Sequence, residues 1–299
     1  MKKINKIICL SMVASLLFSS YVYAEEADNE KQISIPDSFT MIEYDYETGE
    51  EKEVTYQTDT SLTDTSQFLS PVEPYSIIGD DEREPLDFPD SLPLSAIGKI
   101  YITGANGKHY VGTGFLVSDD LVLTAGHCLK NSEMGGNATG FEFKSGLYPN
   151  GAYRGSANAY RSYIPSQWEN GYNSDWDWGL LRLDSPLGSS IGYLNCTTGP
   201  STPTGRQCEI MGYPEDWVTG QYQGTTQVVG FGTIMASSQY KIFYDADTTG
   251  GMSGAPIFIS NTPNMSVSGI HTNGTGLTQP FNSGVRITSA ILTVISQKI

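Results

Sequence analysis

The chain is poor in the residues that most often hold metal ions. Its 299 residues include three histidines and four cysteines, and these show none of the spacings typical of a metal site. Positive charge is also scarce, since 17 Lys and Arg stand against 33 Asp and Glu, a formal net charge of −16. Nucleic-acid binding depends on clustered Lys and Arg at the phosphates. We therefore expect no metal, no other cofactor and no nucleic-acid partner.

Long apolar runs are missing as well. The run at residues 7–18 has twelve residues, whereas a membrane-spanning helix needs about twenty. It follows Lys2, Lys3 and Lys6 and is followed by Val-Tyr-Ala at 22–24, an order typical of a secretory signal peptide. We expect residues 1–24 to be removed on export, and the mature protein to be secreted without further membrane association.

Acidic charge is concentrated in residues 25–75, which hold fourteen Asp and Glu against two Lys. The segment is rich in Thr, Ser and Glu and has few large aliphatic residues, so it buries too little apolar surface to fold alone. One interpretation is a disordered acidic linker. We favour a propeptide, because a signal peptide precedes the segment and a compact domain follows it.

From about residue 95, short apolar runs are separated by Gly, Asn, Asp and Ser, and the 32 glycines fit a chain with many tight turns. Alternation and β-branched content indicate the strands of a sandwich or barrel. Expected strands cover residues 97–103, 114–118, 121–125, 179–183, 227–235, 241–244, 255–259 and 265–271. In the tail, 287–299, Ile287, Ile291, Leu292 and Ile295 fall on one helical face. The predicted fold class is all-β with a closing C-terminal helix.

Three short motifs carry the candidate chemistry. Thr-Ala-Gly-His-Cys at 124–128 contains His127, Asp-Trp-Gly-Leu-Leu begins with Asp177, and Gly-Gly-Met-Ser-Gly-Ala-Pro at 250–256 contains Ser253. Taken singly, each has a structural explanation as a histidine after a strand, a turn residue or a glycine loop. Together, in the order His, Asp, Ser, they fit an acyl-transfer site whose three groups depend on one another. We therefore predict that they form a catalytic triad.

The residue types suit that chemistry. A serine hydroxyl is a poor nucleophile unless a base accepts its proton, and imidazole does so at neutral pH. A buried carboxylate holds the imidazole in the required tautomer and stabilises its positive charge. Gly250 and Gly251 allow the chain to turn so that backbone N–H groups converge on one point. The N–H groups of Gly251 and Ser253 are the predicted oxyanion hole.

These motifs resemble those of the chymotrypsin-type serine proteases and, among them, the bacterial glutamyl endopeptidases, the family of the staphylococcal V8 protease and its Bacillus relatives. The resemblance includes Gly-Tyr-Pro at 212–214 and His-Thr-Asn-Gly at 271–274, and extends from about Ser76 to the C-terminal helix. It implies two six-stranded antiparallel Greek-key barrels, at 76–190 and 191–299, with the site between them. It also implies a bacterial extracellular serine endopeptidase that acts on protein or peptide substrates, and we expect a monomer.

Two positions near the triad need a choice or show a departure. Asp175 is a second candidate for the carboxylate, but only Asp177 is followed by an aromatic residue, a small residue and a strand, as in the family. Met252 stands where the digestive relatives carry the Asp that pairs with their new N-terminus. A thioether cannot form that ion pair, and the glutamyl endopeptidases also lack the Asp.

The residue that sets cleavage specificity has two candidates. Asp247, six residues before Ser253, occupies the place of the carboxylate with which trypsin-like enzymes bind Lys or Arg. His271 matches the histidine that binds the substrate carboxylate in glutamyl endopeptidases, assisted by a hydroxyl at the place of Thr248. Bacillus members also have an Asp at the place of Asp247, so we favour cleavage after Glu, with Asp weaker. The alternatives are a basic preference through Asp247, a purely structural His271, and a protease-fold toxin or binding protein.

The remaining cysteines and the N-terminus of the mature chain complete the expectations. Cys196 and Cys208 are close enough in sequence for a disulfide, which export permits. Cys128 is then left over and is expected to be a small buried apolar residue. His109 falls in an expected hairpin turn and is given no role. Maturation is expected close to Ser76, and because no Glu directly precedes it, we expect a second protease rather than self-cleavage at that bond.

Overall fold

The structure, a computed structural model, describes residues 35–59, 76–219, 222–262, 265–275 and 280–299, all of which belong to one compact unit, Ser34–Ile299. The expected signal peptide and residues 25–34 and 60–75 of the expected propeptide lie outside the described residues. None of the helices in the described part is long and apolar enough to cross a membrane.

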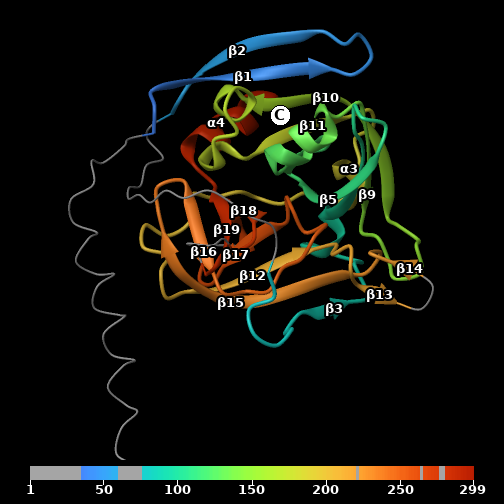
Figure 1. Cartoon of the computed structure of the whole chain (residues 1–299), viewed down its shortest axis with the longest axis vertical. Helices are drawn as coiled ribbons and strands as arrows, with labels where there is room; N and C mark the ends of the chain where they lie inside the picture. Colours follow the sequence, from blue (N-terminus) through green and yellow to red (C-terminus); the bar gives the residue numbers. More distant parts are fainter. Residues whose placement is uncertain (1–34, 60–75, 220–221, 263–264, 276–279) are drawn as a thin grey trace, which may run out of the picture. The chain divides into compact units, whose positions relative to one another are not determined.

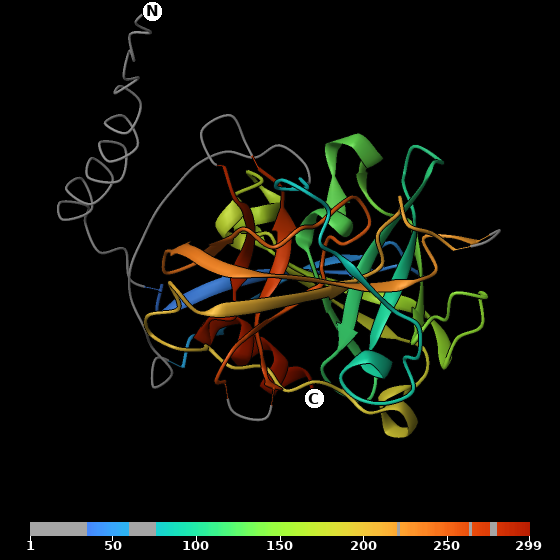
Figure 2. The ribbon, with the colours of Figure 1, turned by 90° about the horizontal axis from the view of Figure 1, so that it is seen from below.

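Two closed antiparallel barrels of six strands each make up the body of the molecule (Figures 1 and 2). In the first, the strand order is β11-β6-β5-β4-β9-β10 and β10 closes onto β11. In the second, the order is β12-β17-β18-β19-β16-β15 and β15 closes onto β12. The prediction of two six-stranded barrels is therefore confirmed.

The first barrel contains β4 (Ile97–Thr103), β5 (His109–Leu116), β6 (Leu121–Thr124), β9 (Gly140–Ser145), β10 (Gly155–Pro165) and β11 (Gly179–Leu183). The second contains β12 (Gln207–Gly212), β15 (Gln227–Ser237), β16 (Lys241–Tyr244), β17 (Pro256–Ile259), β18 (Val267–Asn273) and β19 (Asn282–Arg286). The smaller elements are the strands β7 (Lys130–Asn131), β8 (Gly136–Asn137), β13 (Val218–Thr219) and β14 (Tyr222–Gln223), the helices α2 (Ser166–Glu169) and α3 (Gly188–Ile191), and the 3₁₀ turns η2 (Leu94–Ala96), η3 (Gly126–Cys128), η4 (Ser132–Met134) and η5 (Ser174–Trp176).

The two ends of the segment 76–299 each pack on the barrel farther along or back in the sequence. β3 (Glu84–Leu86), expected in the first barrel, instead pairs with β15 of the second. The C-terminal helix α4 (Ser289–Lys298) packs on the first barrel, and the Arg182 guanidinium on β11 hydrogen-bonds the carbonyl of Lys298. The expected apolar stripe is present, but Ile287 lies before the helix, and Ala290 and Val294 complete the buried face.

A β-hairpin precedes the barrels and is made by β1 (Ser38–Asp45) and β2 (Glu51–Gln57). β9 pairs only with the first part of β10, and β1 pairs with the later part, from Met41 opposite Pro165 to Asp45 opposite Arg161 (Figure 1). The interpretation of 25–75 as a disordered linker is therefore wrong for residues 35–59. The composition of this segment does not support a core of its own, but pairing with an existing sheet edge supplies the missing partner.

The predicted disulfide is not formed. All three cysteines in the described residues are free thiols. Cys208 lies on β12 inside the apolar core of the second barrel. Cys196 lies outside that core, where its backbone forms an isolated parallel β-bridge with Val267. Burial raises the pKa of the Cys196 thiol to about 12 and that of Cys208 still further. Cys128 is buried, as expected.

Candidate active site

His127 is held by the turn that follows β6. The chain leaves β6 at Thr124, and η3 carries the histidine. A β-carbon at Gly126 would lie about 3.1 Å from ring atoms of Trp168 and from the backbone nitrogen of Trp178, so these segments approach closely at this glycine. The ring of Trp168 lies 6.4 Å from that of His127. The imidazole is therefore placed by close packing beneath its loop.

Asp177 occupies the tip of a tight turn between two buried tryptophans. The N–H of Trp178 donates to the carbonyl of Trp176 at 2.8 Å, and Asp177 is the C-cap residue of η5. The carboxylate is fully buried. Its Oδ1 accepts the backbone N–H of His127 at 2.8 Å, and its Oδ2 lies 2.8 Å from His127 Nδ1. The structure thus brings Asp177 to the imidazole, whereas the backbone N–H of Asp175 caps onto the Asn173 side chain.

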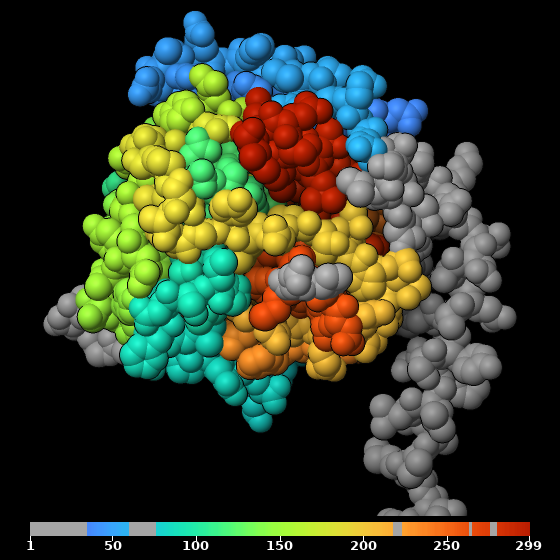
Figure 3. Space-filling view, turned by 180° about the vertical axis from the view of Figure 1, so that it is seen from behind, coloured from blue at the N-terminus to red at the C-terminus, as the bar shows by residue number. Residues whose placement is uncertain are grey.

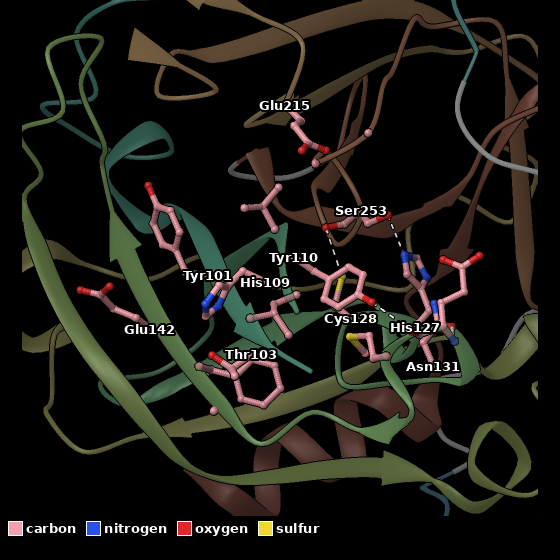
Figure 4. Close-up of a pocket in the computed structure, with 18 of the residues that line it drawn as sticks. Tyr101, Thr103, His109, Tyr110, His127, Cys128, Asn131, Glu142, Glu215 and Ser253 are labelled. Carbon is pink, nitrogen blue, oxygen red and sulfur yellow. Dashed lines mark hydrogen bonds between the residues drawn. The ribbon is translucent and has the colours of Figure 1, made fainter. Parts of the chain in front are cut away.

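Ser253 lies in the loop before β17, directly opposite the imidazole. Its Oγ is 2.6 Å from His127 Nε2, and Figure 4 shows the two side chains facing each other. Gly251 has a φ of +91° and Gly254 a φ of +87°. A β-carbon at Gly254 would lie 2.1 Å from the carbonyl of Thr113, so this position admits no side chain. The two glycines explain why the loop needs its Gly-x-x-Gly spacing.

The loop around Ser253 is anchored by bonds from the first barrel and from the loop after β12. The hydroxyl of Thr113 donates to the carbonyl of Gly251 at 2.8 Å, and the N–H of Glu215 donates to the carbonyl of Gly250 at 2.6 Å. The peptide between Gly250 and Gly251 is trans, so its N–H points in the opposite direction to its carbonyl. Because the Gly250 carbonyl faces Glu215, the Gly251 N–H points away from Glu215. Met252 is fully buried in the core of the second barrel. The residue before the serine therefore contributes packing, where the digestive relatives have an ion pair.

A cavity of about 720 Å³ opens beside the serine and is lined by Ser253, His127, Gly250 and Gly251 on one side (Figure 4). Its other walls come from the first barrel and the loop after β12, with Tyr101, His109, Tyr110, Glu142 and Glu215 among them. His109, which sequence reasoning left without a role, therefore lines the cavity. Nothing in its sequence context identifies it, because the contact depends on how strands of the barrel align.

His271 adjoins the serine loop from β18. Its carbonyl accepts the N–H of Gly254 at 2.7 Å, and its own N–H donates to Ala255 at 2.8 Å. The imidazole is fully buried, with Nδ1 2.5 Å from the hydroxyl of Tyr244. Burial, together with the nearby His127 and Lys241, lowers the pKa of His271 to about 3. The ring is therefore neutral before substrate binds.

Thr248 and Asp247, adjacent in sequence, have different surroundings. The Thr248 hydroxyl is buried and has no hydrogen-bond partner among the described residues. Both carboxylate oxygens of Asp247 accept backbone N–H groups, from Ile78 at 2.7 Å and from Glu82 at 2.9 Å. Asp247 therefore binds the segment that precedes β3 to the second barrel. The Thr248 hydroxyl remains available as a hydrogen-bond donor.

Lys241 is a buried residue at the site that the sequence did not reveal. From β16 its ammonium donates to Asn273 Oδ1 at 2.8 Å, to Thr272 Oγ1 at 3.2 Å and to the carbonyl of Ser174 at 3.3 Å. Burial lowers its pKa to about 8, an effect opposed by the charges of Asp177 and Asp175. It links the Asp177 loop of the first barrel to the strand that carries His271. A lysine within an apolar run suggests an exposed strand residue, so no sequence signal marks this role.

Comparison with known proteins agrees with this geometry. The sequence pattern of the Trypsin family matches residues 77–295. The glutamyl endopeptidase of Bacillus licheniformis is 34% identical over 230 residues, which cover 73% of this chain and 68% of that protein. A protein of Bacillus subtilis called "Extracellular metalloprotease" is 30% identical over 306 residues, 95% of this chain and 92% of its own.

Among solved structures, a Glu endopeptidase in complex with MPD superposes with a TM-score of 0.66 at 26% identity, over 75% of this chain and 99% of that one. In the part of the chain that the structure describes, no group of three or more His, Cys, Asp or Glu side chains is placed to hold a metal ion. With its two barrels, its matched region and its relatives, the chain belongs to the trypsin family of serine proteases and has the chymotrypsin-like fold.

Proposed function

We propose that the protein is a secreted serine endopeptidase that cleaves after Glu, and after Asp more weakly, through an acyl-enzyme. The observation that carries the proposal is the continuous chain of contacts from buried Asp177 through His127 to Ser253, with 2.8 Å and 2.6 Å between the atoms. These distances are those at which a base can accept the proton of a nucleophile. Ser253 is the proposed nucleophile, His127 the base and Asp177 the group that orients it.

In the proposed reaction, Ser253 Oγ attacks the scissile carbonyl carbon while its proton moves to His127 Nε2. The negative charge on the carbonyl oxygen is received by the N–H groups of Gly251 and Ser253. Collapse of the intermediate breaks the C–N bond, and His127 returns the proton to the leaving amine. Water then repeats the sequence on the ester, which releases the acid and restores the serine.

The preference for Glu is assigned to His271 and Thr248. A carboxylate taken from water into a pocket opposes binding unless it is paired or hydrogen-bonded. The buried Thr248 hydroxyl is an available donor. The His271 imidazole is neutral in the unliganded protein, and the negative charge of an approaching carboxylate raises its pKa and so favours its protonation. Binding of Glu is thus coupled to protonation of His271.

The geometry weighs against a basic preference through Asp247. That carboxylate already accepts two backbone N–H groups and is almost fully buried, so a Lys or Arg side chain would have to compete for it. A matched set of peptides with Glu, Asp, Gln, Lys or Phe before the scissile bond tests the assignment. Best cleavage after Lys or Arg would reject the Glu preference, and no cleavage of any peptide would favour a toxin or binding protein.

The class of protease is tested with inhibitors. A phosphonylating or acylating reagent should modify Ser253 and abolish turnover, whereas a metal chelator should leave turnover unchanged. The Ser253→Ala variant should fold and lose activity by roughly 10⁶-fold, the size of effect seen when a triad serine is removed. Loss of activity to the chelator alone would support the chemistry named for the Bacillus subtilis relative.

We also propose that residues 1–24 are a signal peptide, that 25–75 are a propeptide and that the mature chain starts near Ser76. The family match begins at residue 77, which supports this boundary. Ser76 is already bound to the second barrel, because its carbonyl accepts a hydrogen bond from the side-chain amide of Asn282 on β19 at 2.8 Å. Mass spectrometry of the secreted protein measures its first residue directly. An active form that starts before residue 60 would contradict this maturation.

A further inference from the structure

The hairpin β1–β2 lies outside the part of the chain that matches the Trypsin family, yet it is built into the first barrel. Its inner face is apolar and well packed. Phe39, Met41, Ile42 and Tyr56 are buried, and three of them belong to the same apolar core as the first barrel. The acidic side chains that dominate its composition face outward or toward basic partners. The hairpin is therefore docked through a specific interface.

The centre of this interface is the loop of the proposed catalytic carboxylate. The ring of Phe39 lies 5.7 Å from that of Trp176 and 6.5 Å from that of Trp178, the two residues on either side of Asp177. On the other side, Trp176 packs against Tyr240 of the second barrel at 5.8 Å. Trp176 is thus held between the hairpin and the second barrel. Removing the hairpin removes the ring that packs on one side of Trp176, next to Asp177.

Charged contacts at the rim of the interface match the acidic hairpin to basic residues of the barrel. Asp45 pairs with Arg161 on β10 at 2.8 Å, and Arg161 holds the pKa of the Asp45 carboxyl down at about 2. Glu43 pairs with Lys298 at the end of α4 at 2.5 Å. Figure 3 shows the hairpin (blue) directly against α4 (red). The hairpin surface and the barrel surface are therefore complementary in charge as well as in shape.

The hairpin does not reach the proposed catalytic cleft. None of the described residues 35–59 lines the cavity beside Ser253. His127, Asp177 and Ser253 are already in hydrogen-bonding contact with the hairpin in place. A segment that leaves the cleft open and the triad assembled does not act as a plug.

We propose that the barrel surface made by the edge of β10, Trp176, Trp178, Arg161 and Lys298 is a docking site for the hairpin of this same chain, which clamps the Asp177 loop without blocking the cleft. The proposal rests on the proposed removal of residues 25–75 as a propeptide. The hairpin binds this surface in cis while the chain folds. After cleavage between residues 59 and 76, it binds the same surface as a separate peptide.

The cis contact is tested in the full-length chain with Ser253→Ala, which prevents self-cleavage. In this background, Phe39→Ala should lower the melting temperature and the secreted yield, because it removes the ring between Trp176 and Tyr56. Phe39→Leu should restore most of both, and Glu53→Gln, on an exposed position of β2, should change neither. Equal melting temperatures for the Phe39→Ala and Glu53→Gln proteins would overturn the proposal. This readout needs no peptidase activity, so it stands apart from the proposed function.

The trans contact is tested with a synthetic peptide of residues 35–59 and mature enzyme from culture medium, phosphonylated at Ser253 so that it cannot cleave the Glu-rich peptide. At a free concentration about a hundred times its Kd, the peptide should raise the melting temperature of the enzyme by roughly 5–10 °C. It should also change the fluorescence of the buried tryptophans. The same peptide with Phe39→Ala is the matched control. The absence of any thermal shift, or an equal shift with the Phe39→Ala peptide, would overturn the docking site.

Discussion

The proposed triad and the proposed specificity pocket, which consists of Thr248 and His271, differ in how complete their interactions are before substrate arrives. On the triad side, Asp177 is fully buried and accepts from both the backbone and the ring of His127. On the pocket side, Thr248 has no partner among the described residues and His271 is neutral. The difference separates groups that are preorganised for chemistry from groups whose interactions are completed by the substrate.

This contrast has a kinetic consequence. Preorganised groups stabilise the transition state of every substrate, so changes to the triad should lower kcat whatever residue precedes the scissile bond. Groups that wait for a carboxylate act only on substrates that bring one. Changes to the pocket should therefore depend on whether the peptide carries Glu or Gln. Lys241 connects the two sides, because its ammonium bonds both to the Ser174 carbonyl and to Thr272, the residue after His271.

The largest effect that distinguishes the two sides is expected for Asp177→Asn. The amide keeps the shape but favours the wrong tautomer of His127, and the equivalent change in a known triad lowers kcat by about 10⁴-fold. Steady-state kinetics with Glu and Gln peptides should show the same loss for both. The matched control is Asp175→Asn, two residues away and not in contact with the ring, which should retain most of the activity. A larger loss in the control would assign the carboxylate to Asp175.

A smaller and selective effect is expected for His271→Ala. A hydrogen bond to a charged group is worth about 1.5–3 kcal/mol, so kcat/KM for Glu peptides should fall by about ten- to a hundredfold. Gln peptides should lose much less, because they bring no charge. Thr248→Val keeps the size of the side chain and removes the donor, and should give a weaker loss of the same kind. Equal losses for Glu and Gln peptides would make His271 a structural wall residue.

A pH dependence follows from the low pKa of His271. The pKa is about 3 in the unliganded protein, so binding of a Glu carboxylate with protonation of His271 takes up a proton. The ratio of kcat/KM for Glu over Gln peptides should therefore decrease as pH rises, by up to about tenfold per unit between the pKa of His271 in the free enzyme and its higher pKa in the complex, and should level off above the latter. The ratio cancels the titration of His127, which both peptides share. A flat ratio between about pH 6 and 9 would show that His271 stays neutral.

Much of the fold could be predicted because the decisive patterns are local. The strands at 97–103, 179–183 and 241–244 have the bounds expected from their apolar, β-branched runs. β10 was missed, because Gly155–Pro165 is rich in Ser, Ala, Asn and Tyr, and its pairing depends on β9, β11 and β1 around it. The hairpin was missed for the same reason, since its stability comes from the barrel edge.

The candidate site divides in a similar way. His127, Asp177 and Ser253 are recognisable because turn and glycine requirements surround them with characteristic residues, as at Gly251 and Gly254. Lys241 and His109 carry no such mark, because one reaches the site through a buried side chain of β16 and the other through the alignment of strands. The expected disulfide failed because nearness in sequence does not place Cys196 and Cys208 together across a barrel core.

The smallest effect on specificity is expected for Asp247→Asn, and it tests the alternative directly. The Asp247 carboxylate accepts the N–H groups of Ile78 and Glu82, and an amide can replace at most one of these acceptors. The melting temperature should therefore fall, because one buried N–H loses its partner. The order of preference among Glu, Gln, Lys and Phe peptides should stay the same. If the variant instead loses cleavage after Lys or Arg and keeps its stability, Asp247 faces the substrate and the pocket, like the triad, is built in advance.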